Sequence, residues 1–364
     1  MKDSTTKVVM VGLVVLVFTA PLFLRVADVV VLGKNDFIPL YVAAKSSPSE
    51  LYNPQTYQDF QMAQFSGFSE SLRFTRLPFY AVLLKPLGLL SYQQAHLVWF
   101  LLRLGAVIMF VFFWPHESRG DVALMTCLSL SIAVALFNGQ DTLLLLLFIT
   151  LAVRWHTSRP IAAGLSLSLC AIKFHLFILL PLLLLAQRRW CLLRGFIAGA
   201  AILLALSFFG GGWNWPSAYF DTLTDSRVHP ALTQMPNLHG LFSNFPLEMA
   251  FSLVILVAAC FAMQRTNFVL GLAMALTGGI PLSNHSYVSD CVLLTPAVLI
   301  LFAHTRVAWL KAMGVCLVSP VLPLMLLHSR PYAYPMQVIL LLFVFGLAFV
   351  LLREPRGAVE AKPA

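Results

Sequence analysis

The chain has 364 residues, of which 59% are hydrophobic and only 11% are charged. Soluble domains carry roughly 25% charged residues, so this composition excludes a soluble enzyme. The formal net charge of +9 is spread over short loops between apolar runs, where it indicates membrane topology rather than binding to nucleic acid. The sequence therefore predicts an all-α polytopic membrane protein, with residues 1–364 forming a single integral membrane domain.

The apolar runs predict about 12 membrane crossings when the basic loops are placed on the cytoplasmic side. In chain order, the predicted spans are 8–24, 95–114, 121–137, 142–153, 160–172, 174–187, 191–209, 247–263, 267–280, 290–303, 308–327 and 336–352. This arrangement places both termini in the cytoplasm, with 353–364 as a cytoplasmic tail. It also places more than half of the Lys and Arg residues inside.

The segment 160–187 is mostly apolar and separates two basic clusters. One straight helix would place these clusters on opposite sides, which is the arrangement of an alternative with about 11 crossings. Two helices of about 14 residues, roughly 20 Å each, keep both clusters inside and place Lys173-Phe174-His175 at the outer turn. Because a bilayer core is about 30 Å thick, the turn is expected below the outer surface unless the membrane thins.

Two longer segments, 25–94 and 210–246, are predicted to lie on the outer side. Within the first, residues 38–66 form an amphipathic pattern. The apolar run 77–90 is interrupted by Lys85-Pro86 and is too short to span, so it predicts an interfacial or re-entrant helix.

The polar clusters of interest all fall on the outer side in this topology, and Asp36 is the candidate general base. It follows the first apolar run at a predicted water–lipid boundary. Partial desolvation there raises the pKa of a carboxylate toward useful basicity. The alternatives are a solvated loop aspartate or an N-cap for a helix that begins at Phe37.

Lys173 and His175 lie inside an apolar run, where an ionisable residue is costly and indicates a function. A lysine at the outer face is suited to hold a lipid phosphate as a point charge. The alternative is a snorkelling lysine at a helix turn. Arg73 and Arg76 are candidates for further phosphate contacts, or else ordinary interfacial arginines.

Other polar residues are candidates for contacts with a sugar. His285, Tyr287 and Asp290 share a predicted outer turn, where they form a second acid–base group, a partner of a sugar hydroxyl, or a structural hydrogen-bonded cluster. Asn138 and Gln140 are candidates for hydrogen bonds to sugar hydroxyls, or for helix caps.

Trp213 and Trp215 match the interfacial aromatic belt, with stacking on a sugar as the less favoured reading. The sequence has no nucleotide-binding loop and no Asp-x-Asp pair, and no CxxC occurs among its six cysteines. No metal site and no cofactor are therefore expected.

Short motifs recur in an order that resembles a known family. They are Asp36-Phe37, Tyr41, Leu51-Tyr52, Leu77-Pro78-Phe79, Lys85-Pro86-Leu87, Ala95…Trp99, Asn138-Gly139-Gln140, Ala163-Gly164-Leu165…Lys173, Pro181, Asn237…Gly240 and His285-Ser286-Tyr287…Pro296. This order and spacing, from about residue 33 to about residue 300, resembles glycosyltransferase family 87, the polyprenol-phosphate-mannose-dependent α-mannosyltransferases.

The resemblance implies a type-C glycosyltransferase fold and an inverting transfer, without a metal, outside the bacterial inner membrane. It implies a polyprenyl-phosphate sugar as donor and a lipid or glycan as acceptor. The family's catalytic base falls on Asp36, its intramembrane lysine on Lys173 and its late histidine on His285. Asn237 and His239 fall on a substrate-binding motif, although the family usually has serine where this chain has His239. A Pro-Pro pair is also common where this chain has Leu77-Pro78.

Two other functions remain open from the residues alone. A transporter or flippase would use Lys173 and Arg103 as coupling sites, although the chain lacks paired inverted halves. A non-catalytic subunit for assembly of envelope polysaccharide is the other. The expected partners of the protein are the lipid bilayer, a lipid-phosphate sugar as donor and the acceptor of that sugar.

Overall fold

The computed structural model describes residues 27–65, 72–115, 117–225, 232–328 and 331–353. Helices make up 79% of these residues, and no β-strand occurs among them. The all-α class is therefore confirmed. The predicted first span, 8–24, lies outside the described residues, as does nearly all of the tail 353–364.

Five helical runs are long and apolar enough to cross a membrane. They are α6 (Tyr92–Phe113), Pro160–Phe177, α12 (Trp190–Gly211), α15 (Phe245–Arg265) and α20 (Tyr334–Arg353). The pair α7 (Arg119–Leu128) and α8 (Leu130–Phe137), bent by 68°, brings the number to six if it is one span. The described part of the chain is thus a multi-pass membrane protein, while the count of about 12 crossings stays a prediction.

Shorter apolar helices fill the space between these long helices. They are α9 (Thr142–Trp155), α11 (Leu179–Ala186), α16 (Phe268–Leu282), α17 (Leu294–His304), α18 (Ala308–Val318) and α19 (Val321–Leu326). The helix α16 is the centre of the core, because every residue from Phe268 to Pro281 is buried. Such a helix is apolar all round, as expected for one enclosed by other helices.

Two predicted spans are broken in the structure. The run 121–137 divides at Ser129, whose hydroxyl accepts a hydrogen bond from the amide of Ile132 and begins α8. The run 308–327 ends its first helix before Ser319-Pro320, because the residue before a proline is driven out of the helical region. Ser319 accordingly has a ψ of 161°.

The segment 160–187 doubles back, as the two-helix prediction requires. It consists of α10 (Pro160–Ser168), the 3₁₀ stretch η1 (Leu169–Phe177) and α11. Just before this segment, the ring of His156 stacks on Phe268 at 5.0 Å. At its end, Gln187 Nε2 donates to the carbonyl of Asn267 at 3.1 Å. Both ends therefore meet the start of α16, and the bend near Lys173 lies at the far end of the hairpin.

Glycines let α10 and α12 pack backbone against backbone. A Cβ on Gly164 would collide with the backbone of α12, and one on Gly195 would collide with the backbone of α10. Gly195 and Gly199 are four residues apart, and this spacing of small residues is common where membrane helices approach closely. The contact fixes the hairpin, and with it Lys173, against α12.

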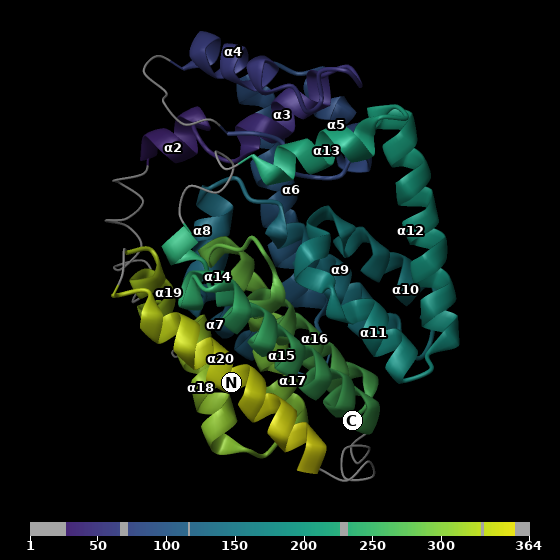
Figure 1. Cartoon of the computed structure of the whole chain (residues 1–364), viewed down its shortest axis with the longest axis vertical. Coiled ribbons are helices and arrows are strands. Elements are labelled where there is room, and N and C mark those ends of the chain that lie inside the picture. Colours follow the sequence, from purple (N-terminus) through teal and green to yellow (C-terminus); the bar gives the residue numbers. More distant parts are fainter. Residues whose placement is uncertain (1–26, 66–71, 116, 226–231, 329–330, 354–364) are drawn as a thin grey trace.

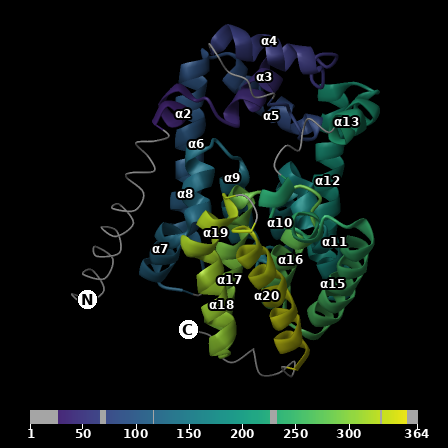
Figure 2. The ribbon, with the colours of Figure 1, turned by 60° about the vertical axis from the view of Figure 1, so that its left-hand side comes forward.

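Short helices gather at one end of the molecule, at the top of Figures 1 and 2. We call this the upper end; it carries α2 (Ala27–Leu32), α3 (Phe37–Lys45), α4 (Pro54–Gln64), α5 (Pro78–Gly88) and α13 (Trp215–Thr224). The predicted amphipathic pattern does not describe α3, which is buried from Phe37 to Ala44. It is covered by α5, whose Gly88 packs directly against the carbonyl of Ala44. The opposite end, at the α11–α12 turn, is the lower end.

Candidate active site

Asp36 directly precedes α3, but its side chain does not cap that helix. The side-chain oxygen of Asn35 accepts the amide of Phe37 instead, at 3.0 Å. The carboxylate of Asp36 accepts hydrogen bonds from Asn138 Nδ2, at 2.5 Å, and from Gln140 Nε2. The helix-cap alternative is therefore wrong, and the carboxylate faces the loop between α8 and α9.

The backbone of this loop is fixed on several sides. The amide of Asp36 donates to the carbonyl of Asn138 at 3.1 Å, and Trp99 Nε1 donates to the carbonyl of Gly139 at 2.8 Å. Gly139 has a φ of 75°, in the left-handed region that favours glycine. The tight turn at Gly139 aims the side chains of Asn138 and Gln140 at the same carboxylate.

The surroundings of Asp36 make it a better base than an ordinary aspartate. Burial raises its pKa from 3.8 to about 6, although the hydrogen bond from Gln140 and the charges of Lys173 and Arg76 act in the opposite direction. The residue as a whole is half-buried. Asp36 is thus mostly ionised at neutral pH and accepts protons more readily than an ordinary aspartate.

Lys173 lies at the bend of the hairpin, where its φ of −128° and ψ of 57° interrupt the helix. Its side chain is only 4% exposed, so it is not a snorkelling lysine. The Nζ atom donates to Gln140 Oε1 at 2.9 Å and to Asp290 Oδ1 at 2.5 Å, and it lies 3.6 Å from Asp141 Oδ1. Because Gln140 also donates to Asp36, one amide group links the candidate base to the buried cation.

A second ion pair, between Arg76 and Asp141, adjoins the first. Arg76 donates through Nε and Nη2 to the two carboxylate oxygens of Asp141, at 2.8 and 3.1 Å. Burial opposes the ionisation of Asp141, but Arg76 and Lys173 outweigh it and hold the pKa of Asp141 below its usual range. Asp141 and Asp290 were not predicted from the sequence as partners of the cations. A signal was present, because a cation buried in a membrane protein requires a counter-charge.

Two histidines of the predicted site, His175 and His285, lie close to each other. The ring centroids of His175 and His285 are 6.2 Å apart, and His285 lies 4.9 Å from the ring of Tyr287. The backbone amide of Tyr287 donates to Asp290 Oδ2 at 2.9 Å. Asp290 therefore binds Lys173 with one oxygen and holds the turn that carries His285 with the other.

A groove of about 470 Å³ opens beside His175. Most of its lining consists of apolar side chains from the hairpin 160–187, completed by Phe196 of α12 and Leu282 of α16. Its polar groups are His175, Ser283 and Asn284. The Nε2 atom of His175 is buried and has no hydrogen-bond partner among the described residues. The groove thus combines a long apolar wall with a polar end next to the ion pairs.

Three predicted binding residues lie outside this cluster. Arg73 pairs with Asp225 at 2.5 Å. His239 pairs with Glu248 at 3.0 Å and is 40% exposed. Asn237 caps the first turn of α14 (Leu238–Phe242) and donates to a backbone carbonyl at the end of α16. The structure gives each of them a local partner and brings none of them to Asp36.

The fold and the site define a multi-pass helical membrane protein with an acid–base and ion-pair centre at one end. The family model for glycosyltransferase family 87 matches residues 74–279, more than half of the chain. The chain belongs to this family and is a membrane glycosyltransferase. Asp36 and His285 lie outside the matched residues. No curated protein and no solved structure matches the chain.

Proposed function

We propose that the chain transfers mannose from a polyprenyl-phosphate carrier to a lipid or glycan acceptor on the outer face of the bacterial inner membrane. The observation that carries the proposal is the bridge through Gln140. It joins Asp36, a carboxylate with a raised pKa, to Lys173, a buried cation beside an apolar groove. In a displacement reaction, the base can accept the proton of the attacking hydroxyl while the cation stabilises the leaving phosphate.

The apolar groove supports a lipid-linked donor. Its hairpin wall suits a polyprenyl chain, since burial of each CH₂ group contributes about 0.8 kcal/mol. Its polar end brings the unpartnered Nε2 of His175 near the rings of His285 and Tyr287. These groups suit the phosphate, with Lys173 supplying positive charge behind them.

The proposed step is an in-line displacement with inversion. The acceptor hydroxyl loses its proton to Asp36, and its oxygen bonds to the anomeric carbon of the sugar. The bond between that carbon and the phosphate oxygen breaks, and the electron pair leaves with the polyprenyl phosphate. The positive charge of Lys173 stabilises the negative charge that develops on the leaving phosphate. A β-linked donor gives an α-linked product, and the step needs no metal because phosphate is already a good leaving group.

The test uses the purified protein with radiolabelled polyprenyl-phosphate-mannose and a bacterial lipid extract. We expect release of polyprenyl phosphate together with a mannosylated product of α configuration. Polyprenyl-phosphate-glucose tests the choice of sugar, and mannose 1-phosphate tests the need for the lipid. If the folded, purified protein consumes no lipid-linked sugar of either kind, the proposal fails and a transport or assembly role takes its place.

A further inference from the structure

A second groove, of about 730 Å³, lies at the upper end of the molecule. Its walls come from the link between α3 and α4, from the segment before α5, from the end of α12 and from α13 with its flanking residues. The volume falls within the roughly 300–1,000 Å³ of small-molecule sites. Unlike the apolar groove, it lies among the short helices of the upper end and mixes aromatic with polar side chains.

The polar side chains of this groove keep hydrogen-bonding capacity. Asp221 is exposed and makes no side-chain hydrogen bond to the described residues. Asn214 precedes α13 without capping it. Asn53 uses its oxygen to accept the amide of Gln55, which leaves its amide nitrogen as a donor. Carboxylate and amide groups of this kind bind hydroxyl groups as acceptors and donors.

An exposed aromatic ring completes the groove. Trp213 is 85% exposed and lies next to Gly211 and Gly212. A Cβ on Gly212 would meet nothing closer than 3.9 Å, so the floor beside the ring is open. A flat apolar ring beside hydroxyl-binding groups matches a sugar, which has one apolar face and a polar rim. The Arg73–Asp225 ion pair forms part of the wall.

The groove is joined to the candidate active site by two tyrosines. Tyr52 lines the groove, and its hydroxyl donates to the carbonyl of Arg76 at 2.7 Å. The ring of Tyr219 lies 5.6 Å from Tyr52 and 6.5 Å from Phe174, the neighbour of Lys173. A ligand bound in the groove is therefore separated from the ion pairs by a single layer of side chains, formed by Tyr52, Tyr219 and Phe174.

We propose that this groove, lined by Trp213, Asp221, Asn214 and Asn53, binds the neutral saccharide portion of the acceptor. The proposal rests on the proposed transfer reaction and adds where the acceptor lies. An anionic headgroup fits less well, because the side chains that line the groove carry two carboxylates against one cation. An acyl chain fits less well because polar groups interrupt the lining.

The experiment measures binding without the donor, by calorimetry on the purified protein in detergent. The probes are octyl α-mannoside and its disaccharide and tetrasaccharide homologues. We expect Trp213→Ala to weaken binding by about 3- to 10-fold, as for loss of one aromatic contact, and Asp221→Ala to weaken it by a similar factor. Trp190→Ala is the matched control, because Trp190 is 54% exposed at the other end of α12.

The outcomes separate this proposal from the transfer reaction. If the wild-type protein binds none of the probes, or if Trp213→Ala binds them as tightly as wild type, the groove is not the saccharide site. The second result would leave Trp213 as a membrane anchor. If probe binding depends on Trp213 and Asp221 while no donor is consumed, the groove stands and the proposed reaction fails.

Discussion

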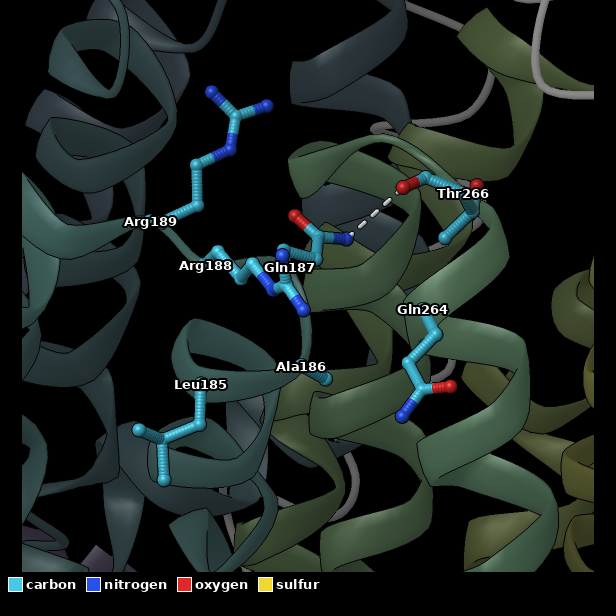
Figure 3. A pocket seen from close by; sticks show the side chains of 7 residues that line it. All are labelled: Leu185, Ala186, Gln187, Arg188, Arg189, Gln264 and Thr266. Atoms are coloured by element: carbon cyan, nitrogen blue, oxygen red, sulfur yellow. Dashed lines mark hydrogen bonds between the residues drawn. The ribbon is translucent and has the colours of Figure 1, made fainter.

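The two ends of the molecule hold their positive charge in different ways. At the upper end, Lys173 and Arg76 are buried and each is paired with a carboxylate. At the lower end, a larger cavity of about 810 Å³ is lined by Arg188, Arg189, Gln187 and other side chains, with no carboxylate among its lining residues (Figure 3). Gln187 there donates to the carbonyl of Thr266 at 3.1 Å.

This comparison shows that the volume of a cavity does not by itself identify the active site. Basic residues at one end of a membrane protein are expected from topology, since Lys and Arg favour the cytoplasmic side. Buried, mutually paired charges are costly and indicate function. The centre of buried, paired charges beside Asp36 is therefore the candidate active site, and the cavity at the lower end is a feature of the helix turn.

The largest effect is expected from Asp36→Asn at the upper end. This change removes the proton acceptor and keeps the size of the side chain, so turnover should fall by roughly 10²–10⁴-fold. Stability should not fall at neutral pH, because burial disfavours the ionised carboxylate that the change removes.

Donor consumption and thermal unfolding measure the two effects of Asp36→Asn. Asp59→Asn is the matched control, since Asp59 is exposed on α4. Near-wild-type turnover in Asp36→Asn would reject the catalytic assignment.

The second effect concerns the buried cation. Lys173→Ala leaves Asp290 without its ion-pair partner, so the free energy of unfolding should fall by about 3–5 kcal/mol and donor binding should weaken. Lys173→Arg keeps the charge but not the compact geometry, so it should recover most of the stability and only part of the donor affinity.

Thermal unfolding and donor-binding measurements on both Lys173 variants separate these roles. Unchanged donor affinity in both folded variants, Lys173→Ala and Lys173→Arg, would make Lys173 a purely structural counter-ion for Asp290.

The positions of the spans follow from apolar length, but the breaks within them do not. The predicted span 95–114 matches α6 (Tyr92–Phe113) within a few residues. The bend at Ser129 was missed because a serine inside an apolar run signals a helix break only when its hydroxyl caps the next turn. The hairpin 160–187 was predicted because charge placement, unlike hydropathy, distinguishes one crossing from two.

The candidate site was predictable where a residue conflicts with its surroundings. Asp36 and Lys173 stand out as charges beside or within apolar runs. A counter-charge for Lys173 was predictable but its identity was not, because Asp290 is 117 positions away in the chain and only the fold brings it close. Arg73 was chosen as a cation on the predicted outer side, and His239 by motif order. Neither criterion can tell whether a residue has a local partner.

The third effect concerns pH and sharpens the role of the upper end. Only ionised Asp36 accepts a proton, and its pKa is about 6. The value of kcat/KM should therefore rise about tenfold per pH unit below 6 and level off above it. Gln140→Leu removes a hydrogen bond that lowers this pKa, so the inflection should move upward.

Stability should depend on pH in the opposite sense. The folded state holds the Asp36 proton more tightly than the unfolded state, whose pKa is 3.8. The contribution of Asp36 to the free energy of unfolding is therefore highest at low pH. It declines as the pH rises from about 4 through 6. A wild-type rate profile that stays flat down to pH 4.5 would show that Asp36 is not the titrating base.

The smallest effect is expected at the lower end, where the charge is not part of the proposed reaction. Arg188 has a φ of 54°, in the left-handed region that favours glycine. Arg188→Gly relieves this strain and should raise the free energy of unfolding by about 0.5–1 kcal/mol, with turnover unchanged. Arg189 has an ordinary φ of −79°, so Arg189→Gly removes the same charge without relief and should lower stability slightly.

Opposite shifts in thermal unfolding with equal turnover would assign the lower cavity to the backbone of the α11–α12 turn. A tenfold loss of turnover in both variants would instead give it a part in the reaction, and the contrast between the two ends would no longer hold.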